Sequence, residues 1–299
     1  MSWDKITEMN NPASTEIDKK STQEILHIIN VEDAHIATAV KESLLHIGRF
    51  IDDLVTRLHK GGRLFYVGSG TSGRLGVLDA VECPPTYRTD PEMVQGIIAG
   101  GYDALVRSVE GAEDNPNDGV QAILDFGVTK MDVVLGISAS SSSPFVLGAM
   151  EKAKLLGSLT GLIICNYPQK LDYIDHMISI IVGPEVITGS TRMKAGTATK
   201  MVLNMVTTTA MIKMNKTFGN LMVDLKASNQ KLWDRGARIM SHLTDLSYDE
   251  SLKLLQSAEG EVKTAVVMSK LNLNIEDARE ELREKQGSLL KVLDNPENS

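Results

Sequence analysis

A glycine- and hydroxyl-rich turn between a strand and a helix most constrains how this chain can fold. Residues 66–82 read YVGSGTSGRLGVLDAVE, a short apolar stretch followed by a turn and a helical pattern that ends on Glu82. Glycines in the turn let the backbone approach a ligand closely. Its hydroxyls lie beside the free N–H groups of a helix start, which favours binding of a phosphate monoester. The predicted phosphate-binding residues in this turn are Gly68, Ser69, Thr71 and Ser72.

A second cluster of hydroxyls follows another predicted strand, at 133–137, and precedes a predicted helix at 145–156. The residues that we expect to bind the ligand here are Ser138, Ser140, Ser141 and Ser143. A serine run alone is often a linker, but a linker is not expected between a buried strand and a helix start. In a doubly wound sheet, such loops lie at the carboxyl ends of strands, where ligands bind. The two clusters therefore predict one ligand held from two sides.

Short apolar strands alternate with helices through the middle of the chain. The predicted strands are 64–67, 94–99, 133–137, 159–165 and 177–182, and the predicted helices are 72–82, 102–110, 117–126, 145–156 and 191–213. Pro84-Pro85 is expected to end the first of these helices. Short buried strands between helices indicate a parallel sheet covered on both faces. We therefore expect an α/β fold, a three-layer, doubly wound parallel sheet of the flavodoxin-like kind.

Helices without strands flank this sheet. Ser21 and Glu24 form a capping-box pattern, and apolar residues over 36–58 keep one helical face for more than six turns. Charge-rich residues after 217 predict a small helical bundle, with helices at 249–257, 259–269 and 275–285. The expected divisions are 1–50 (arm and helices), 51–216 (sheet domain) and 217–299 (helical region). The polar residues 1–20 predict an arm that docks elsewhere, for example on a second subunit, or a disordered tail.

A third segment, residues 183–200, reads GPEVITGSTRMKAGTATK at a predicted helix start. It combines glycines, hydroxyls and charges of both signs within a few residues. Lone charges at such a place usually form a solvated cap, but this combination favours a ligand site. We therefore predict that Glu185, Arg192 and Lys194 bind substrate.

A dinucleotide site is the simplest competing interpretation, because residues 68–73 match G-x-G-x-x-G formally. That pattern alone is weak. A dinucleotide fold expects an acidic residue at the end of the second strand, but here that strand ends in Gly100-Gly101. The hydroxyl-rich turn also suits a phosphate monoester better than a pyrophosphate. We therefore prefer a phosphate monoester ligand.

Composition excludes several classes of function. The 299 residues carry a net charge of −8, which argues against nucleic acid and membrane surfaces as partners. Two cysteines, Cys83 and Cys165, imply no disulfide framework and fit a reducing compartment. The six histidines form no metal-binding spacing, so no metal is expected. The polar first 20 residues do not form a signal peptide, and we expect a cytoplasmic protein.

These motifs together resemble a known family. The first hydroxyl turn and the serine loop look like the sugar isomerase (SIS) domain, a phosphosugar-binding fold. The 183–200 segment resembles the signature shared by glucokinase regulatory protein and the bacterial N-acetylmuramic acid 6-phosphate etherases. Five parts of the chain also look like the etherases: the Asn11-Pro12 arm, Gly68–Arg74, the Glu82-Cys-Pro-Pro run, the segment 110–114 and the helical tail. The resemblance covers nearly the whole chain.

The resemblance implies a homodimeric enzyme of cell-wall recycling that needs no metal or redox cofactor. It would cleave the lactyl ether of N-acetylmuramic acid 6-phosphate to N-acetylglucosamine 6-phosphate and D-lactate, at a site to which both subunits can contribute. Such an elimination needs a base at C2 and an acid for the departing oxygen. By resemblance, Glu113 is the base and Glu82 the acid, which then activates water. Glu110 and Asp114 are close rivals of Glu113.

Two other functions stay open at this point. A phosphosugar aldose–ketose isomerase on the same fold would also take a proton from C2, but would release no lactate. A non-catalytic phosphosugar sensor resembling the regulatory protein would bind without turnover. That family carries two sugar-binding domains in a much longer chain, whereas this chain has room for one. The presence of both Glu82 and Glu113 also argues against a pure sensor.

Overall fold

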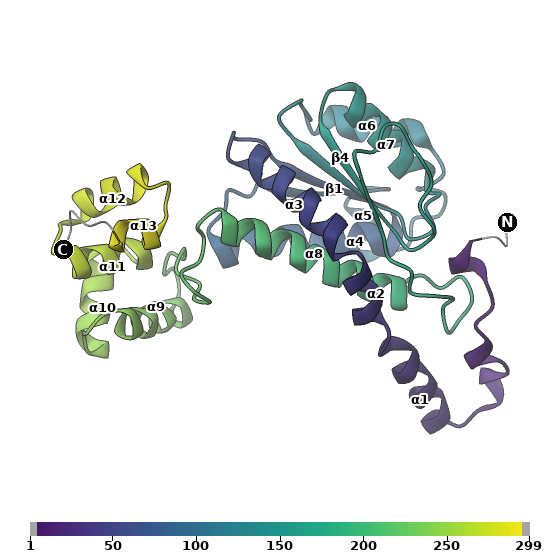
Figure 1. Ribbon diagram of the computed structural model, residues 1–299, viewed down its shortest axis with the longest axis horizontal. Coiled ribbons are helices and arrows are strands. Elements are labelled where there is room, and N and C mark those ends of the chain that lie inside the picture. Colours follow the sequence, from purple (N-terminus) through teal and green to yellow (C-terminus); the bar gives the residue numbers. More distant parts are fainter. Residues whose placement is uncertain (1–4, 295–299) are drawn as a thin grey trace. The chain divides into compact units, whose positions relative to one another are not determined.

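A computed structural model describes residues 5–294, in which strands and helices alternate as predicted (Figure 1). The strands are β1 (Leu64–Gly68), β2 (Val94–Ile98), β3 (Val133–Ile137), β4 (Leu159–Ile164) and β5 (His176–Ser179). The helices up to the last strand are α1 (Thr22–Asp33), α2 (Ile36–Glu42), α3 (Leu44–Leu58), α4 (Gly70–Tyr87), α5 (Asp103–Val106), α6 (Pro116–Asp125) and α7 (Pro144–Leu155). Those after it are α8 (Lys194–Lys213), α9 (Gln230–Leu243), α10 (Tyr248–Ser257), α11 (Val262–Leu271), α12 (Ile275–Glu284) and α13 (Leu289–Leu293).

The five strands form one parallel sheet in the order β2-β1-β3-β4-β5, which confirms the predicted flavodoxin-like arrangement. The order reverses between β1 and β3, the point at which ligands bind in such sheets. Gly68 at the end of β1 lies level with Ile98 of β2 and with Ile137 of β3. The loops that follow these three strands therefore start side by side at one edge.

Helices cover both faces of the sheet (Figure 1). On one face, Phe65, Val134 and Leu162 are fully buried together with Met150 of α7 and Ile123 of α6. On the other face, a β-carbon at Gly161 would lie 2.8 Å from the ring of Phe50 on α3, so this helix packs directly on β4. The strands β1 and β3 consequently bury both of their side-chain faces, as their apolar sequences predict, whereas the edge strands β2 and β5 are partly exposed.

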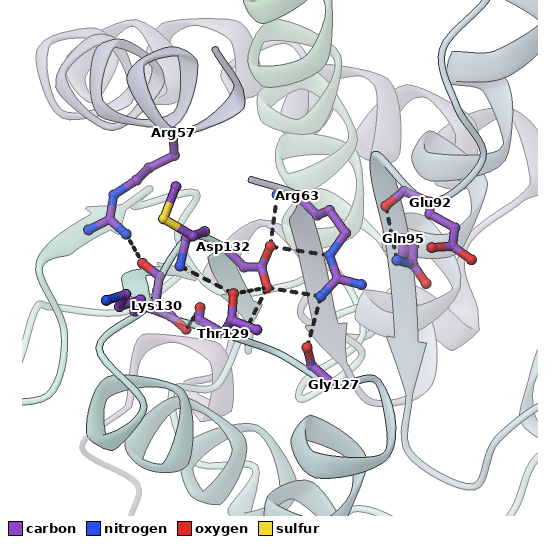
Figure 2. Close-up of polar contacts among 10 residues, drawn as sticks. Arg57, Arg63, Glu92, Gln95, Gly127, Thr129, Lys130 and Asp132 are labelled. Atoms are coloured by element: carbon purple, nitrogen blue, oxygen red, sulfur yellow. Dashed lines mark hydrogen bonds and ion pairs between the residues drawn. The ribbon is translucent and has the colours of Figure 1, made fainter. Parts of the chain in front are cut away.

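An ionic cluster fastens the opposite, amino-terminal edge of the sheet (Figure 2). The carboxylate of Asp132, just before β3, accepts hydrogen bonds from the backbone N–H and the guanidinium of Arg63, just before β1, at 2.9–3.2 Å. It also accepts from the backbone N–H and hydroxyl of Thr129 at 2.8 and 3.0 Å. Burial opposes ionisation of Asp132, but these hydrogen bonds outweigh it and lower the pKa of the carboxyl. The cluster therefore links the adjacent strands β1 and β3 at this edge.

Three helix predictions were wrong in detail. The apolar face over 36–58 belongs to two helices, α2 and α3, because Ser43 leaves helical geometry and its hydroxyl donates to the carbonyl of Ser179 at 2.5 Å. Pro84-Pro85 does not end α4, which continues to Tyr87. Prolines remove N–H donors but keep a helix-compatible φ, so one further turn follows. The helix expected at 102–110 is only α5, four residues long.

The N-terminal arm packs against its own chain, which corrects the expectation that it docks elsewhere. Ile6 and Thr7 are buried, and the backbone N–H of Thr7 donates to Asn166 Oδ1 at 3.5 Å. Asn11 is also buried, and its amide donates to the carbonyl of Pro184 at 3.0 Å. Polar side chains and short 3-10 turns replace the apolar pattern that would have revealed this docking.

The chain clusters into two compact units. One takes in the described residues up to Val81 together with Pro91–Thr207, and the other takes in Glu82–Asp90 and the described residues from Thr208 onward. The second unit has its own core, which α9, α10, α11, α12 and α13 supply, with Met240, Leu255 and Val266 fully buried. The predicted limits at residues 50 and 216 stay a prediction. Among residues 5–294, none of the helices combines the length and apolar character that spanning a bilayer requires.

Candidate active site

The turn after β1 brings a hydroxyl to the centre of the candidate site. A β-carbon at Gly68 would lie 2.6 Å from the backbone nitrogen of Gly73, so only glycine lets the end of β1 approach the start of α4 this closely. Ser69 stands at this junction, half-buried. Its Oγ donates to Glu113 Oε2 at 2.8 Å and lies 3.2 Å from Ser143 Oγ. The three predicted residues thus meet, although they lie on three different loops.

The serine loop after β3 is folded back on itself. The backbone N–H of Ser143 donates to the buried Oγ of Ser138 at 3.3 Å, and Ser140 and Ser142 exchange a hydrogen bond at 2.9 Å. Ser141 has a φ of +57°, a left-handed conformation in which its backbone N–H donates to the carbonyl of Ser138. The turn ends at the N-terminus of α7. Hydroxyls therefore lie beside the N-terminus of α7, whose partial positive charge favours a phosphate.

The loop that carries Glu113 is fixed to the same helix start. The backbone N–H of Phe145 on α7 donates to the carbonyl oxygen of Glu113 at 3.0 Å. A cavity of about 220 Å³ opens beside this contact. The described residues that line it are Ser69, Gly70, Arg74, Ala99, Ala104, Ser108, Val109, Glu110, Gly111, Ala112 and Glu113. Asp114, one of the rivals of Glu113, is absent from this lining, whereas Glu110 is present.

The third segment supplies a third helix start, that of α8, and an ion pair. Glu185 is fully buried, and its carboxylate accepts from the backbone N–H groups of Lys194 and Ala195 at 2.9 and 3.0 Å, at the start of α8. Burial raises the pKa of Glu185, although these donors oppose the rise. Lys194 Nζ lies 2.5 Å from Glu32 Oε2, and Asn11 donates to the same oxygen at 2.7 Å.

These contacts bind the segment to α1 and to the N-terminal arm. Arg192 is exposed in the loop before α8. Thr71 is half-buried, and its methyl carbon lies 3.5 Å from where a β-carbon of Gly196 would stand, so the starts of α4 and α8 are close. The predicted roles of Glu185, Arg192 and Lys194 in substrate binding stay predictions.

Glu82 stands apart from these residues along the chain. It is exposed on α4, twelve residues after Gly70. At 1.5 Å per residue, that stretch of helix is about 18 Å long. Ser72, also half-buried, lies in the first turn of the same helix.

Curated relatives match the chain along almost its entire length. N-acetylmuramic acid 6-phosphate etherase from Salinibacter ruber is 47% identical over 296 residues, which are 98% of this chain and 95% of that protein. The etherase from Clostridioides difficile is 48% identical over 289 residues, which are 96% of this chain and 95% of that protein. The chain belongs to the N-acetylmuramic acid 6-phosphate etherase family.

Two further comparisons concern the fold of the chain. A family model described as the glucokinase regulatory protein N-terminal SIS domain matches residues 46–154, which include Ser69, Glu113 and the serine loop. A Listeria monocytogenes structure provisionally described as a sugar-phosphate isomerase superposes with a TM-score of 0.50 at 18% identity. It covers 66% of this chain and 94% of that chain. This likeness shows that the chain has the fold of that structure, and the matching family model describes residues 46–154 as an SIS domain.

Two residues of the cavity were missed by the sequence analysis as candidates for the site. Ser108 lies in an exposed loop with no distinctive pattern around it. Arg74 was noted only as part of the resemblance, because a single arginine on a helix usually faces solvent. The signal that could have found it is position: Arg74 lies one turn after Gly70, on the helix that begins at the phosphate-type turn.

Proposed function

We propose that this chain cleaves the D-lactyl ether of N-acetylmuramic acid 6-phosphate, giving N-acetylglucosamine 6-phosphate and D-lactate, in the recycling of peptidoglycan amino sugars. The observation that carries the proposal is the hydrogen bond between Ser69 and Glu113. This bond joins the turn before α4, where we expect the phosphate to bind, to the carboxylate of Glu113. One sugar can therefore reach both. The etherase names of relatives matched along nearly the whole chain support the same reaction.

The phosphate handle is bound at the starts of α4 and α7 in this proposal. Backbone N–H groups there carry partial positive charge, and the hydroxyls of Ser69 and Ser143 add donors. Gly68, Thr71, Ser72, Ser138, Ser140 and Ser141 complete the proposed cradle. The net charge of −8 repels an anionic substrate, so these local donors must provide the attraction.

The proposed chemistry is an elimination followed by addition of water. The C1 aldehyde of the open-chain sugar acidifies the C2 proton, which Glu113 removes. Electrons from the C2–H bond form a C2–C3 double bond, and the C3–O bond to lactate breaks. Glu82 gives its proton to the departing oxygen and then takes one from the water whose oxygen bonds to C3. The protonated Glu113 returns its proton to C2, so the double bond is saturated again and both carboxyl groups regain their starting states. Only proton transfers are required, so we propose a carbon–oxygen lyase that uses no cofactor.

We further propose that the enzyme is a homodimer in which Glu82 acts on a sugar bound by the other copy. C2 and C3 are adjacent carbons, so the base and the acid must flank one bond. Glu113 is tied to Ser69 just before α4, whereas Glu82 stands about 18 Å further along that helix. A second copy that presents its own Glu82 resolves this separation. A cytoplasmic location is proposed as well, since a chain with two cysteines has no disulfide framework and fits a reducing compartment.

A coupled D-lactate assay tests the function. Purified protein is given N-acetylmuramic acid 6-phosphate and, in parallel, the unphosphorylated sugar. D-lactate from the phosphorylated sugar alone is the expected result. Binding of the phosphosugar by calorimetry without lactate would overturn the proposal in favour of a sensor, and interconversion of aldose and ketose would favour an isomerase.

A further inference from the structure

The cavity beside Glu113 contains a positive charge that the proposed chemistry does not use. Arg74 is half-buried on α4 and lines the cavity with Glu110 and Glu113. Of the described residues in that lining, it is the one that carries positive charge. Arg74 is therefore the residue of this lining that can attract a negatively charged group of a ligand.

Hydrogen bonds hold Arg74 without neutralising it. Nε donates to the carbonyl of Leu105 at 3.3 Å, and Nη2 donates to the carbonyl of Arg107 at 3.1 Å. Both acceptors are backbone carbonyls, which orient the guanidinium but carry no net charge. A guanidinium has more N–H donors than these two bonds use, and it matches a carboxylate with two parallel hydrogen bonds. Arg74 is thus positioned in advance for a carboxylate.

Other cations of the signature segment are engaged elsewhere. Lys194 is 3% exposed and pairs with Glu32. Lys200 lies 3.8 Å from the carboxylate of Asp79 and also bonds to Asn204. Arg192 remains the rival, but it does not line the cavity that contains Glu113.

We propose that Arg74 binds the carboxylate of the lactyl ether and so makes the site specific for a 3-O-lactyl sugar. This inference rests on the proposed function, whose substrate carries two anionic groups. The helix starts and hydroxyls bind the phosphate, and Arg74 binds the carboxylate. The carboxylate is two bonds from the ether oxygen on C3, and C3 is bonded to the C2 from which Glu113 takes a proton. The two residues, Arg74 and Glu113, line the same cavity. This agrees with the closeness of the lactyl carboxylate to C2 in the substrate.

Two uncleavable ligands isolate the lactyl group. The 1,5-anhydro derivatives of N-acetylmuramic acid 6-phosphate and N-acetylglucosamine 6-phosphate lack C1 aldehyde character, so neither can be eliminated, and they differ only at C3. Their dissociation constants are measured by calorimetry for the wild type and for Arg74→Met, Arg74→Lys, Arg192→Met and Arg107→Met. Arg107 is the matched control, since its side chain is exposed and does not line the cavity, and the substitution keeps the backbone carbonyl that accepts from Arg74.

The expected result is a loss of at least tenfold in affinity of Arg74→Met for the lactyl ligand, as for a charge-assisted hydrogen bond, and less than twofold for the other. Arg74→Lys keeps the charge, so it retains part of the preference. Arg107→Met binds both ligands as the wild type does. Equal losses for both ligands in Arg74→Met and Arg74→Lys, or a lost preference in Arg192→Met instead, overturn the inference. Failure of the proposed function is separate, because it appears as absence of D-lactate from the cleavable substrate with wild-type protein.

Discussion

At the scale of single residues, the division of labour between Glu113 and Glu82 can be separated by isotope exchange. Glu113→Gln keeps the size of the side chain but removes the base. We expect it to lose exchange of the C2 proton with D₂O, followed by NMR, by about 10²- to 10⁴-fold, the usual contribution of one acid–base group. Glu82→Gln is expected to lose D-lactate release while exchange at C2 persists in part.

The two variants serve as controls for each other. Loss of both activities in Glu82→Gln would contradict separate roles for the two carboxylates. Wild-type exchange in Glu113→Gln would transfer the role of base to Glu110, which lines the same cavity.

Residue patterns predicted loops better than they predicted side-chain partners. The turn at Ser69 and the serine loop could be assigned to one sheet edge, because parallel strands end on the same side. The contact of Lys194 with Glu32 could not be predicted, since the partners are 162 residues apart and neither stands in a pattern that names the other. A lysine in a glycine–hydroxyl segment suggests an anionic ligand, but in the structure an internal carboxylate holds it.

At the scale of elements, two glycines allow α6 and α7 to touch. A β-carbon at Gly119 would lie 2.0 Å from the carbonyl oxygen of Phe145, and one at Gly148 would lie 2.3 Å from that of Pro116. We expect Gly119→Ala and Gly148→Ala each to lower the free energy of unfolding by about 1–3 kcal/mol or more, because backbone must shift. Urea denaturation of the purified variants measures this.

Gly48 provides the matched control for that substitution. It lies within α3, and a β-carbon there would meet no atom within 4 Å. Gly48→Ala should therefore raise stability by about 0.5–1 kcal/mol, the helix preference of alanine over glycine. Similar effects at all three positions would mean that the α6–α7 contact is looser than its geometry indicates.

The cluster of Arg63 and Asp132 gives stability a defined dependence on pH. The folded-state pKa of Asp132 is lowered, so its contribution is full above the unfolded value of about 3.9 and is lost as pH falls through the folded value. We expect Asp132→Asn to cost about 2 kcal/mol at pH 7, as for hydrogen bonds to a charged group. Urea unfolding of variant and wild type should show this difference shrinking below about pH 4. A difference independent of pH would mean that Asp132 acts through packing alone.

Helix periodicity predicted where helices occur, but not where they break. The apolar residues from 36 to 58 keep their spacing through Ser43, so no change of pattern marks the break. The break follows from a partner in β5, the carbonyl of Ser179, which sequence spacing does not reveal. Conversely, Pro84-Pro85 predicts a helix end, but α4 continues past these prolines to Tyr87.

At the scale of the whole molecule, the proposed exchange of Glu82 between copies can be tested with mixed dimers. Glu82→Ala and Glu113→Ala are co-expressed with different affinity tags, and dimers carrying both tags are purified. If each site combines Glu113 of one copy with Glu82 of the other, one of the two sites in a mixed dimer is intact, and about half of the wild-type D-lactate rate returns.

Dimers of a single variant are the reference for this experiment. Glu82→Ala carrying both tags and Glu113→Ala carrying both tags should stay inactive. Mixed dimers that stay equally inactive would show that each site takes both carboxylates from one chain.

The hydroxyl of Ser69 has a single proton, and the shorter of its two hydrogen bonds is to Glu113, at 2.8 Å against 3.2 Å to Ser143. A phosphoryl oxygen that accepts this proton takes it away from the carboxylate. In the proposed reaction, the arriving phosphate therefore frees the base that will act four carbons away on the same sugar. The phosphate would thus activate the base as well as anchor the sugar. With an unphosphorylated sugar in the cavity, Glu113 would keep its hydrogen bond from Ser69 and be a weaker base. The preference for the phosphorylated sugar would then appear in the rate of turnover as well as in binding.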